Sequence, residues 1–398
     1  MLISFNVSNH LGVSSMMEDC LFVADTKNRS PIRNSELQKD GCSILTSVFL
    51  LGDNGSGKTS YLNALYSMAK FVTGDDFGPI SRARTVADKE SSYEIVIKDN
   101  ENILIEYSFT VGGDKITVTR ENLTVSNNGA ETVIFDRVHT DNPIKESLAE
   151  AYPAEHYRKL TADDYKYYIR VYDYYGITPF EVLENGNEAL IPLRNDLFLT
   201  NCWAYSEDWP DVYGIKQVCK FFENGIVFWQ DVKDDSNFFS NILSFEEIYR
   251  DAKSMAFRSG YNGNLSPFLR RLKKCRSKVS WADSLKKEDY LIRSIDEIIK
   301  LYSLIAFARQ KEVILVIDDF GDNLSGSFVR DIIDNFMSLT CRSQLLAATH
   351  KEGIILSNGE ISNDSIYIMK EGNCIRLNEY KNISKENRLS LYNQGRFF

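Results

Sequence analysis

One short segment, residues 52–59 with the sequence GDNGSGKT, has the residue types and spacing that bind phosphate groups. It fits the pattern G-x-x-x-x-G-K-[ST] at every fixed position. Glycines let the backbone curl so that successive N–H groups point at an anion, and a following helix N-terminus adds partial positive charge. Lys58 can then reach the β- and γ-phosphates of a nucleotide, and the Thr59 hydroxyl can bind Mg²⁺. The pattern predicts nucleotide contacts from Gly52, Asn54, Gly55, Ser56, Gly57, Lys58, Thr59 and Ser60.

The sequence on both sides of this loop supplies the elements that such a loop needs. Residues 44–51 are mostly apolar and predict a buried strand, and residues 60–69 place apolar side chains at helical spacing. A Gly-rich turn between a strand and a helix can also bind nothing. Because strand, loop and helix occur together and in order, we favour phosphate binding.

A second candidate segment lies far downstream, where an aliphatic run at residues 313–317 precedes Asp318 and Asp319. A continuous β-branched run is typical of a strand buried on both faces in a parallel sheet. We expect this strand to lie beside the one that leads into the phosphate loop, which would bring Asp318 to the Mg²⁺ ion. Asp319 would orient or deprotonate the attacking water. The alternative is a core strand that ends in a solvated acidic turn.

A third segment, residues 343–350, predicts another strand and ends in His350, and a helix is expected before it at about residues 327–338. In nucleotide hydrolases of the ABC type, a histidine after the next strand contacts the γ-phosphate. A lone histidine is otherwise more often a surface or packed residue, but the order of these elements favours a γ-phosphate sensor. The predicted catalytic residues are thus Lys58, Asp319 and His350, and the predicted metal ligands are Thr59 and Asp318.

Composition restricts the classes of function. The chain has 398 residues and a formal net charge of −10, so it can form two lobes and has no global attraction for nucleic acid. Its seven cysteines are scattered, form no C-x-x-C pair and are accompanied by only four histidines. This argues against a zinc site and for reduced thiols in a cytoplasm. The N-terminus does not resemble a signal peptide, and no apolar run approaches the roughly 20 residues that span a bilayer. We therefore expect a cytoplasmic protein without a membrane contact.

Taken in order along the chain, these segments resemble those of a known family. The chain is similar to the ABC-like AAA-domain ATPases (AAA_15 and AAA_21) of bacterial anti-phage and abortive-infection systems. These are related to the overcoming-lysogenization-defect (OLD) proteins and to the ATPase heads of recombination and SMC proteins. The similarity includes an opening strand at residues 1–9, the phosphate loop, the acidic strand, Thr349-His350 and a closing Y-x-x-G-R segment at residues 391–397. It implies an α/β P-loop NTPase fold of the ABC/SMC-head type, with ATP and Mg²⁺ as ligands.

Two departures from the family pattern predict slow ATP hydrolysis. The residue after the metal-binding acid is usually glutamate, and the shorter Asp319 would hold an attacking water too far away. The Ser-Gly pair of the ABC signature is not intact near residues 294–297, where Ile295 and Asp296 would hinder contact with a partner's γ-phosphate. Since about 1.4 kcal/mol of barrier is a factor of ten in rate, we expect turnover below roughly ten per second, the median for enzymes.

The motifs divide the chain into three predicted parts. Residues 1–142 form the N-terminal part of the ATPase lobe, where alternating runs at 93–137 predict an antiparallel β-subdomain of hairpins. Residues 143–290 form a mostly helical insertion. Residues 291–398 form the C-terminal part of the lobe, so that the whole is a mixed sheet flanked by helices.

The predicted insertion contains two features with alternative interpretations. Eight tyrosines between residues 152 and 175 could stack on bases, but such density more often marks helix packing or a protein interface, which we favour. A basic run from Arg270 to Lys287 is either a solvated helix face or a contact for nucleic-acid phosphates or an acidic partner.

Three functions follow from these predictions. The favoured one is an ATP-binding sensor of an anti-phage system that acts in a homo-oligomer and controls a separate effector, a nuclease or toxin. Few residues follow His350, so we expect no nuclease domain of the kind that OLD nucleases carry after the ATPase. The alternatives are a DNA-repair ATPase similar to SMC and RecF heads, which the lack of long heptad runs disfavours, and a nucleotide-locked scaffold with negligible hydrolysis.

Overall fold

The computed structural model describes the residues that form the main sheets and their covering helices. The tyrosine-rich stretch 152–175, the basic run 270–287, the signature-like residues 294–297 and most of the predicted insertion lie outside the described residues. The described residues are 1–13, 22–24, 35–37, 43–73, 89–99, 101–112, 117–138, 214–235, 300–301, 303–305, 307–308, 311–322, 324, 326–337, 343–371 and 373–397.

A six-stranded sheet forms the centre of the fold, in the order β10-β11-β12-β5-β13-β14. Neighbouring strands are parallel except β13 and β14, which makes it a mixed sheet. The strands β5, β11 and β12 are buried at every position, as their aliphatic runs predict. The bounds are β5 (Ser47–Leu51), β10 (Ile226–Phe228), β11 (Ile314–Ile317), β12 (Gln344–Ala348), β13 (Ile366–Lys370) and β14 (Asn373–Arg376).

The strand order corrects one prediction. β12 lies between β11 and β5, so the acidic strand is not the neighbour of the strand that leads into the phosphate loop. The reason is that three parallel strands with two apolar faces can pair in any order as far as burial is concerned. The strand that carries His350 at its end therefore takes the central place between the two motifs.

The apolar stretch 44–51 is also not one strand. β4 (Ser43–Leu45) pairs with β2 (Val23–Ala24) and β3 (Ser35–Leu37) in a separate three-stranded antiparallel sheet, and β5 begins at Ser47. The backbone hydrogen bonds change partner between β4 and β5. The Leu45 N–H donates to Phe22 O (2.6 Å), whereas Thr46 O accepts from the Leu345 N–H of β12 (2.8 Å).

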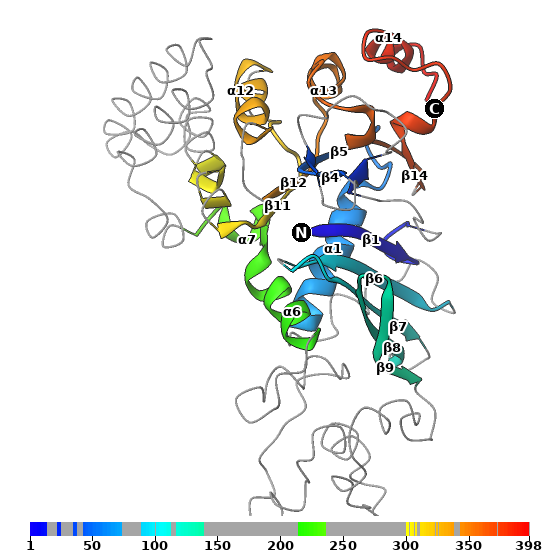
Figure 1. Ribbon diagram of the computed structural model, residues 1–398. Coiled ribbons are helices and arrows are strands. Elements are labelled where there is room, and N and C mark those ends of the chain that lie inside the picture. The colour runs from blue at the N-terminus through cyan, green and yellow to red at the C-terminus, as the bar shows by residue number, and fades with distance from the viewer. Residues whose placement is uncertain are drawn as a thin grey trace, which may run out of the picture.

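Helix α1 (Lys58–Val72) lies between the central sheet and a second large sheet (Figure 1). Side chains alternate along each central strand, so Val48 and Leu50 of β5 pack in the core around α1, whereas Phe49 and Leu51 pack on the opposite face. Two hydrophobic cores therefore fix the end of β5 and the start of α1, which hold the phosphate loop between them.

The second large sheet is antiparallel, in the order β1-β6-β7-β8-β9, and confirms the predicted β-subdomain. β8 is the longest of its strands and ends at Asn127, and the opening strand β1 pairs with β6. Asn128 and Gly129 both have positive φ (51° and 83°), as the two-residue turn between β8 and β9 requires. The bounds are β1 (Leu2–Ser8), β6 (Ser91–Lys98), β7 (Leu104–Gly112), β8 (Thr117–Asn127) and β9 (Ala130–Val138).

Helices α12 (Gly326–Met337), α13 (Glu352–Ser357) and α14 (Arg388–Asn393) contribute to the core on the opposite face of the central sheet (Figure 1). α12 occupies the place predicted for a helix between the acidic strand and the strand that ends in His350. Short 3₁₀ turns occur at Asn363–Ser365 and Leu377–Glu379. Among the described residues, no helix is both long and apolar enough to cross a membrane.

Residues 214–235 fall within the range predicted as a helical insertion. They form α6 (Ile215–Lys220), a π-helix (Phe221–Gly225), β10 and α7 (Trp229–Val232). β10 pairs with β11, so this part of the range contributes a strand to the central sheet. The boundaries of the three predicted parts otherwise remain a prediction.

Candidate nucleotide-binding site

The phosphate loop, residues 52–59, joins β5 to α1 and needs glycine at its turns. Gly52, Gly55 and Gly57 have φ of 144°, 79° and 108°, which L side chains rarely adopt. A Cβ at Gly52 would also collide with the carbonyl oxygen of Met369 on β13. These conformations produce a tight curl of the kind that points backbone N–H groups at an anion.

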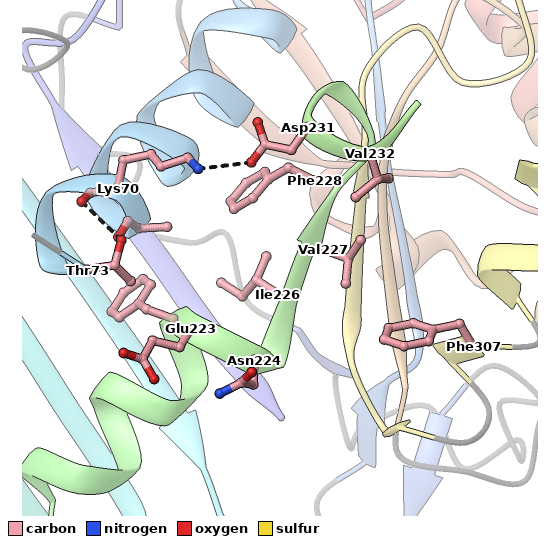
Figure 2. Close-up of a pocket in the computed structure, with 12 residues that line it drawn as sticks. Lys70, Thr73, Glu223, Asn224, Ile226, Val227, Phe228, Asp231, Val232 and Phe307 are labelled. Atoms are coloured by element: carbon pink, nitrogen blue, oxygen red, sulfur yellow. Dashed lines mark hydrogen bonds and ion pairs between the residues drawn. The ribbon is translucent and has the colours of Figure 1, made fainter. Parts of the chain in front are cut away.

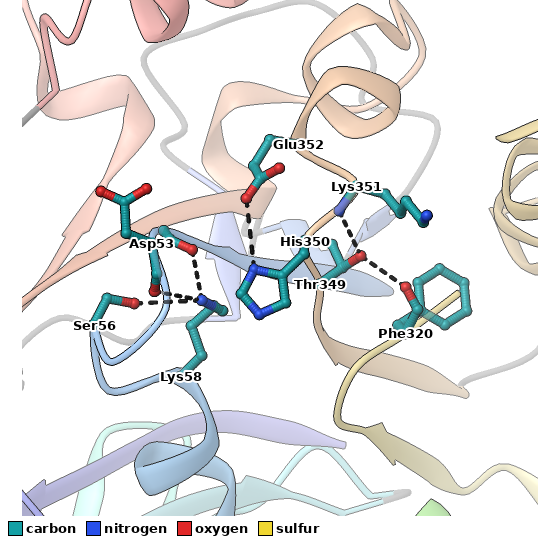
Figure 3. Close-up of polar contacts among 9 residues, drawn as sticks. Asp53, Ser56, Lys58, Phe320, Thr349, His350, Lys351 and Glu352 are labelled. Atoms are coloured by element: carbon teal, nitrogen blue, oxygen red, sulfur yellow. Dashed lines mark hydrogen bonds and ion pairs between the residues drawn. The ribbon is translucent and has the colours of Figure 1, made fainter. Parts of the chain in front are cut away.

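Lys58 is the first residue of α1 and is buried, with 5% of its surface exposed. Its ammonium group donates to the carbonyl oxygens of Gly52 (2.5 Å) and Asp53 (2.9 Å) and lies 3.5 Å from Ser56 Oγ. Figure 3 shows this group turned into the curl of the loop. Burial lowers the pKa of Lys58. Four carboxylates oppose that change, those of Glu352, Asp318, Asp53 and Asp319.

Asp318 directly follows β11 and contacts the phosphate loop. One oxygen of its carboxylate accepts a hydrogen bond from the Asp319 N–H at 3.1 Å. Burial raises the pKa of Asp318, while the Thr59 side chain lowers it. The two predicted metal ligands therefore interact, even though β12 separates their strands, because parallel strands end at the same edge of the sheet.

Asp319 occupies a tight turn. It has a left-handed backbone conformation (φ 52°) and an exposed side chain. Gly321 in the same turn has φ of 77°, and a Cβ there would meet Val329 Cγ2 at 2.5 Å. Asp319, Asp322 and His350 each offer one oxygen or nitrogen atom within 4.8 Å of the others. The turn thus brings together Asp319 and His350, which the sequence predicts as catalytic.

Thr349 determines where His350 lies. Its buried hydroxyl donates to Phe320 O (2.7 Å) and accepts from Lys351 N (3.0 Å), and its own N–H donates to Leu50 O (3.2 Å). Thr349 therefore ties the end of β12 to the turn after β11 and to β5 (Figure 3). His350 follows with its Nδ1 3.9 Å from Glu352 Oε1.

These side chains suit a magnesium nucleotide. A loop that points N–H groups inward beside a buried ammonium group suits phosphate, and a hydroxyl in contact with a carboxylate supplies the oxygen ligands that Mg²⁺ prefers. Gly52 supports the fit. The Cβ of any other residue would enter the space inside the phosphate loop, 2.8 Å from Ser56 Oγ, and would displace that oxygen.

Comparison with known proteins gives the family. The family model AAA_21, described as "AAA domain, putative AbiEii toxin, Type IV TA system", matches residues 47–293, more than half of the chain. The chain belongs to the AAA_21 family. Its fold is that of a mixed α/β P-loop NTPase with an antiparallel subdomain, and its family is that of AAA-type ATPases associated with toxin–antitoxin and abortive-infection systems.

Solved structures that match this AAA_21 protein over most of its length have low sequence identity to it. An SMC head bound to the C-terminal winged-helix domain of ScpA has 12% identity and a TM-score of 0.38, with 94% of this chain and 95% of that chain covered. The recombination mediator RecF with ATP has 11% identity and a TM-score of 0.35, with 94% and 99% covered. No curated protein matches the chain.

The AAA_21 site includes two side chains that sequence patterns did not single out, those of Asp322 and Glu352. Asp322 Oδ1 is buried without a hydrogen-bond partner among the described residues, and it lies beside Asp319 and His350. Glu352 Oε1 lies 3.9 Å from His350 Nδ1. Neither residue belongs to a motif that the sequence indicates.

This AAA_21 chain also contains a cavity of about 420 Å³ lined by the π-helix, β10 and the last turn of α1. Figure 2 shows Lys70 and Asp231 at its edge, joined by a 3.2 Å ion pair. Lys58 begins α1 and Lys70 lies near its end, so at 1.5 Å per residue the helix separates them by roughly 18 Å. The cavity is therefore separate from the nucleotide site.

Proposed function

We propose that this protein is an ATP-binding sensor that hydrolyses ATP slowly and controls a separate effector, a nuclease or toxin, in defence against phage. The phosphate loop carries the proposal, because its positive-φ glycines curl around the buried Lys58 ammonium group, on which the Asp318 carboxylate of the acidic strand also acts. The description of the AAA_21 family as belonging to toxin–antitoxin systems supports the defence setting.

The predicted phosphate-binding, metal-binding and catalytic residues have separate roles in this proposal. Backbone N–H groups of residues 52–57 and the Lys58 ammonium bind the β- and γ-phosphates of ATP. Thr59 and Asp318 would hold Mg²⁺, which would neutralise negative charge on the phosphate groups. The Asp319 carboxylate accepts a proton from the attacking water, and a ring nitrogen of His350 donates a hydrogen bond to a γ-phosphate oxygen.

Slow turnover follows from Asp319. Its side chain is one methylene shorter than the glutamate usual at this position, and its carboxylate lies beside Asp322 and His350. A modest misplacement of the attacking water would lower the rate greatly, since roughly 1.4 kcal/mol is tenfold. We expect turnover below about ten per second.

Control of the effector follows from the way the site is assembled. Lys58, Asp318 and His350 follow three different strands, so a nucleotide that contacts all three favours the conformation in which those strand ends are together. A ligand shifts such an equilibrium by its differential affinity for the two states. We further propose a cytoplasmic homo-oligomer whose basic run, Arg270 to Lys287, contacts an acidic partner or nucleic acid. Charge reversal at Arg270, Arg271, Lys273 and Lys274 that left both contacts intact would exclude this role for the run.

Two variants separate nucleotide binding from hydrolysis. Lys58→Ala removes charge-assisted hydrogen bonds to phosphate and should weaken ATP binding by roughly tenfold or more in calorimetry. Asp319→Ala should retain ATP binding and lower turnover by roughly 10²- to 10⁴-fold. We expect both variants to abolish protection of cells from phage. Protection that is lost only in Lys58→Ala would favour the nucleotide-locked scaffold, and wild-type protein that takes up no ATP would refute the proposal.

The effector itself can be identified by what copurifies with the protein in the presence of ATP and in its absence. We expect a nuclease or another toxin to copurify, with a yield that depends on the nucleotide. Stoichiometric ATP-dependent binding of the pure protein to DNA ends, without such a partner, would instead indicate a DNA-repair ATPase.

A further inference from the structure

Three side chains outside the phosphate loop bring donor atoms together where two central strands end. Asp319 and Asp322 belong to the turn after β11, and His350 follows β12. One oxygen of each aspartate and one ring nitrogen of the histidine lie within 4.8 Å of one another. Asp318, the predicted Mg²⁺ ligand, does not belong to this group. The three side chains therefore form a cluster of two carboxylates and an imidazole beside the predicted Mg²⁺ site.

One oxygen of this cluster is buried and has no hydrogen-bond donor. It is Oδ1 of Asp322, which no donor in the described part of the chain reaches. Buried polar atoms are nearly always paired, because burial removes their water and an unpaired atom then costs free energy. A metal ion in the cluster would be a partner for this oxygen and would offset the repulsion between the two carboxylates. The unpaired oxygen therefore favours a cation at this place.

The imidazole of His350 has the surroundings of a metal-binding histidine. Glu352 Oε1 lies 3.9 Å from Nδ1, and Figure 3 shows this edge of the ring turned toward Glu352. A histidine that binds a metal usually directs its other ring nitrogen at a carboxylate or a carbonyl, which orients the ring and makes the ligand more basic. Glu352 is in the position to do this for His350, with Nε2 as the nitrogen that binds the ion.

The donor atoms select the kind of ion. Two carboxylate oxygens and an imidazole nitrogen suit Zn²⁺ and similar transition-metal ions, whereas Mg²⁺ takes oxygen ligands. Donors about 2.0–2.2 Å from a tetrahedral Zn²⁺ ion lie roughly 3.4 Å from one another, and the exposed side chain of Asp319 can rotate to reach that spacing. Cysteine and histidine spacing argued against a zinc site, but two of the three ligands here are aspartates, which that spacing does not consider.

We propose that Asp319, Asp322 and His350 bind a transition-metal ion such as Zn²⁺, and that the bound ion stops ATP hydrolysis. The ion engages the carboxylate that accepts a proton from the attacking water and the imidazole that contacts the γ-phosphate, so neither group can act while the ion is bound. The metal site depends only on the geometry of the cluster. Its effect on hydrolysis rests on the proposed ATP function and gives the ATPase a metal-controlled inactive state.

Calorimetric titration of the full-length chain with Zn²⁺, in the absence of nucleotide, tests the site. Asp322→Asn and His350→Ala each remove one ligand, and Asp334→Asn is the matched control, because it changes a half-buried aspartate of α12 outside the cluster. Wild type and the control should bind one equivalent of Zn²⁺ that both ligand variants bind at least about 100-fold more weakly, since loss of an outer partner alone costs about 10- to 100-fold. Zn²⁺ bound elsewhere, at cysteines for example, is common to all four proteins. Ligand variants that keep every equivalent would overturn the proposal.

Hydrolysis at saturating Mg²⁺–ATP tests the effect of the ion. Added Zn²⁺ should lower the rate of wild type and of Asp334→Asn by about 100-fold or more, the contribution of a positioned general base, with a midpoint that matches the calorimetric affinity. Asp322→Asn, whatever its own rate, should not respond to the same Zn²⁺ concentrations. Equal inhibition of both aspartate variants would show that Zn²⁺ acts by displacing Mg²⁺ and would overturn the inhibition.

Binding of a fluorescent ATP analogue in Mg²⁺ without Zn²⁺ separates this proposal from the ATP function. Protein that binds the analogue but lacks the Zn²⁺ equivalent would overturn the metal site and leave the ATP function standing. Protein that binds Zn²⁺ through the cluster but takes up no analogue would support the metal site and overturn the ATP function, and with it the inhibition.

Discussion

Replacing Thr349 by valine removes one hydroxyl group from the junction beneath the site and keeps nearly the same side-chain shape. That hydroxyl donates to Phe320 O at 2.7 Å and accepts from Lys351 N at 3.0 Å, and Thr349 is fully buried. Phe320 follows the two aspartates of the acidic strand, and Lys351 follows His350. The perturbation therefore disconnects the two turns that carry predicted catalytic residues.

The size of the effect follows from the two lost hydrogen bonds. A neutral hydrogen bond contributes about 1 kcal/mol net, and a buried partner left unsatisfied costs about 1–3 kcal/mol. The carbonyl of Phe320 is buried, whereas Lys351 is half-buried and its N–H can be reached by water more readily. We expect Thr349→Val to lower the free energy of unfolding by about 2–3 kcal/mol. A displacement of about 1 Å at Asp319 or His350 would in addition lower kcat by up to about 100-fold.

Urea unfolding and steady-state ATP hydrolysis measure the two effects separately. Thr349→Ser is the control, because it keeps the hydroxyl and removes only a methyl group. We expect the serine variant to retain most of the activity and the valine variant to lose it under conditions where both are folded. Valine and serine variants with equal turnover would show that the junction does not position the catalytic side chains.

Two further predictions concern other parts of the chain. Gly52→Ala should abolish measurable ATP binding in calorimetry, because its Cβ would collide with Met369 O at a φ of 144°, while Gly359→Ala, with no atom within 4 Å of an added Cβ, should bind normally. Burial lowers the pKa of His10 from 6.5 to about 4, so the unfolded chain binds a proton that the folded chain does not as pH falls through this range. Stability should therefore be highest above pH 6.5 and fall by about 3 kcal/mol by pH 4. Urea unfolding midpoints measured over this pH range test the prediction. The Tyr93→Phe variant, which retains the buried histidine, should still lose stability as pH falls, whereas the His10→Phe variant should not.

The parts of the site that could be predicted are those encoded locally. The phosphate loop is set by glycines and a lysine within eight consecutive positions, and β11 and β12 by short aliphatic runs that end in polar residues. The loop, α1, β11, β12 and the hairpins of the antiparallel sheet all occur where the sequence predicts them. Local patterns specify these features because each depends on backbone conformation or burial over a few residues.

The order of the strands could not be predicted in the same way. An aliphatic run indicates that a strand is buried but does not indicate its neighbours. Gln344 illustrates the difference, because its side-chain amide bonds Leu2 N (2.6 Å), Leu2 O (2.9 Å) and Leu45 O (3.0 Å), across 342 positions in the first two cases. That one buried amide links β1, β4 and β12, and nothing in the residues around it indicates its partners.

The charges of the site explain why its long-range contacts matter as much as its motif. ATP would bring further negative charge to Lys58, on which four carboxylates already act, those of Glu352, Asp318, Asp53 and Asp319. Two like charges 4 Å apart repel by about 4 kcal/mol at an effective dielectric constant of 20. Phosphate can bind only if the carboxylates are held by other donors or by a metal ion. The Asp319 N–H donates to one oxygen of the Asp318 carboxylate at 3.1 Å, and this bond helps to keep that carboxylate from pairing with the lysine that the nucleotide needs.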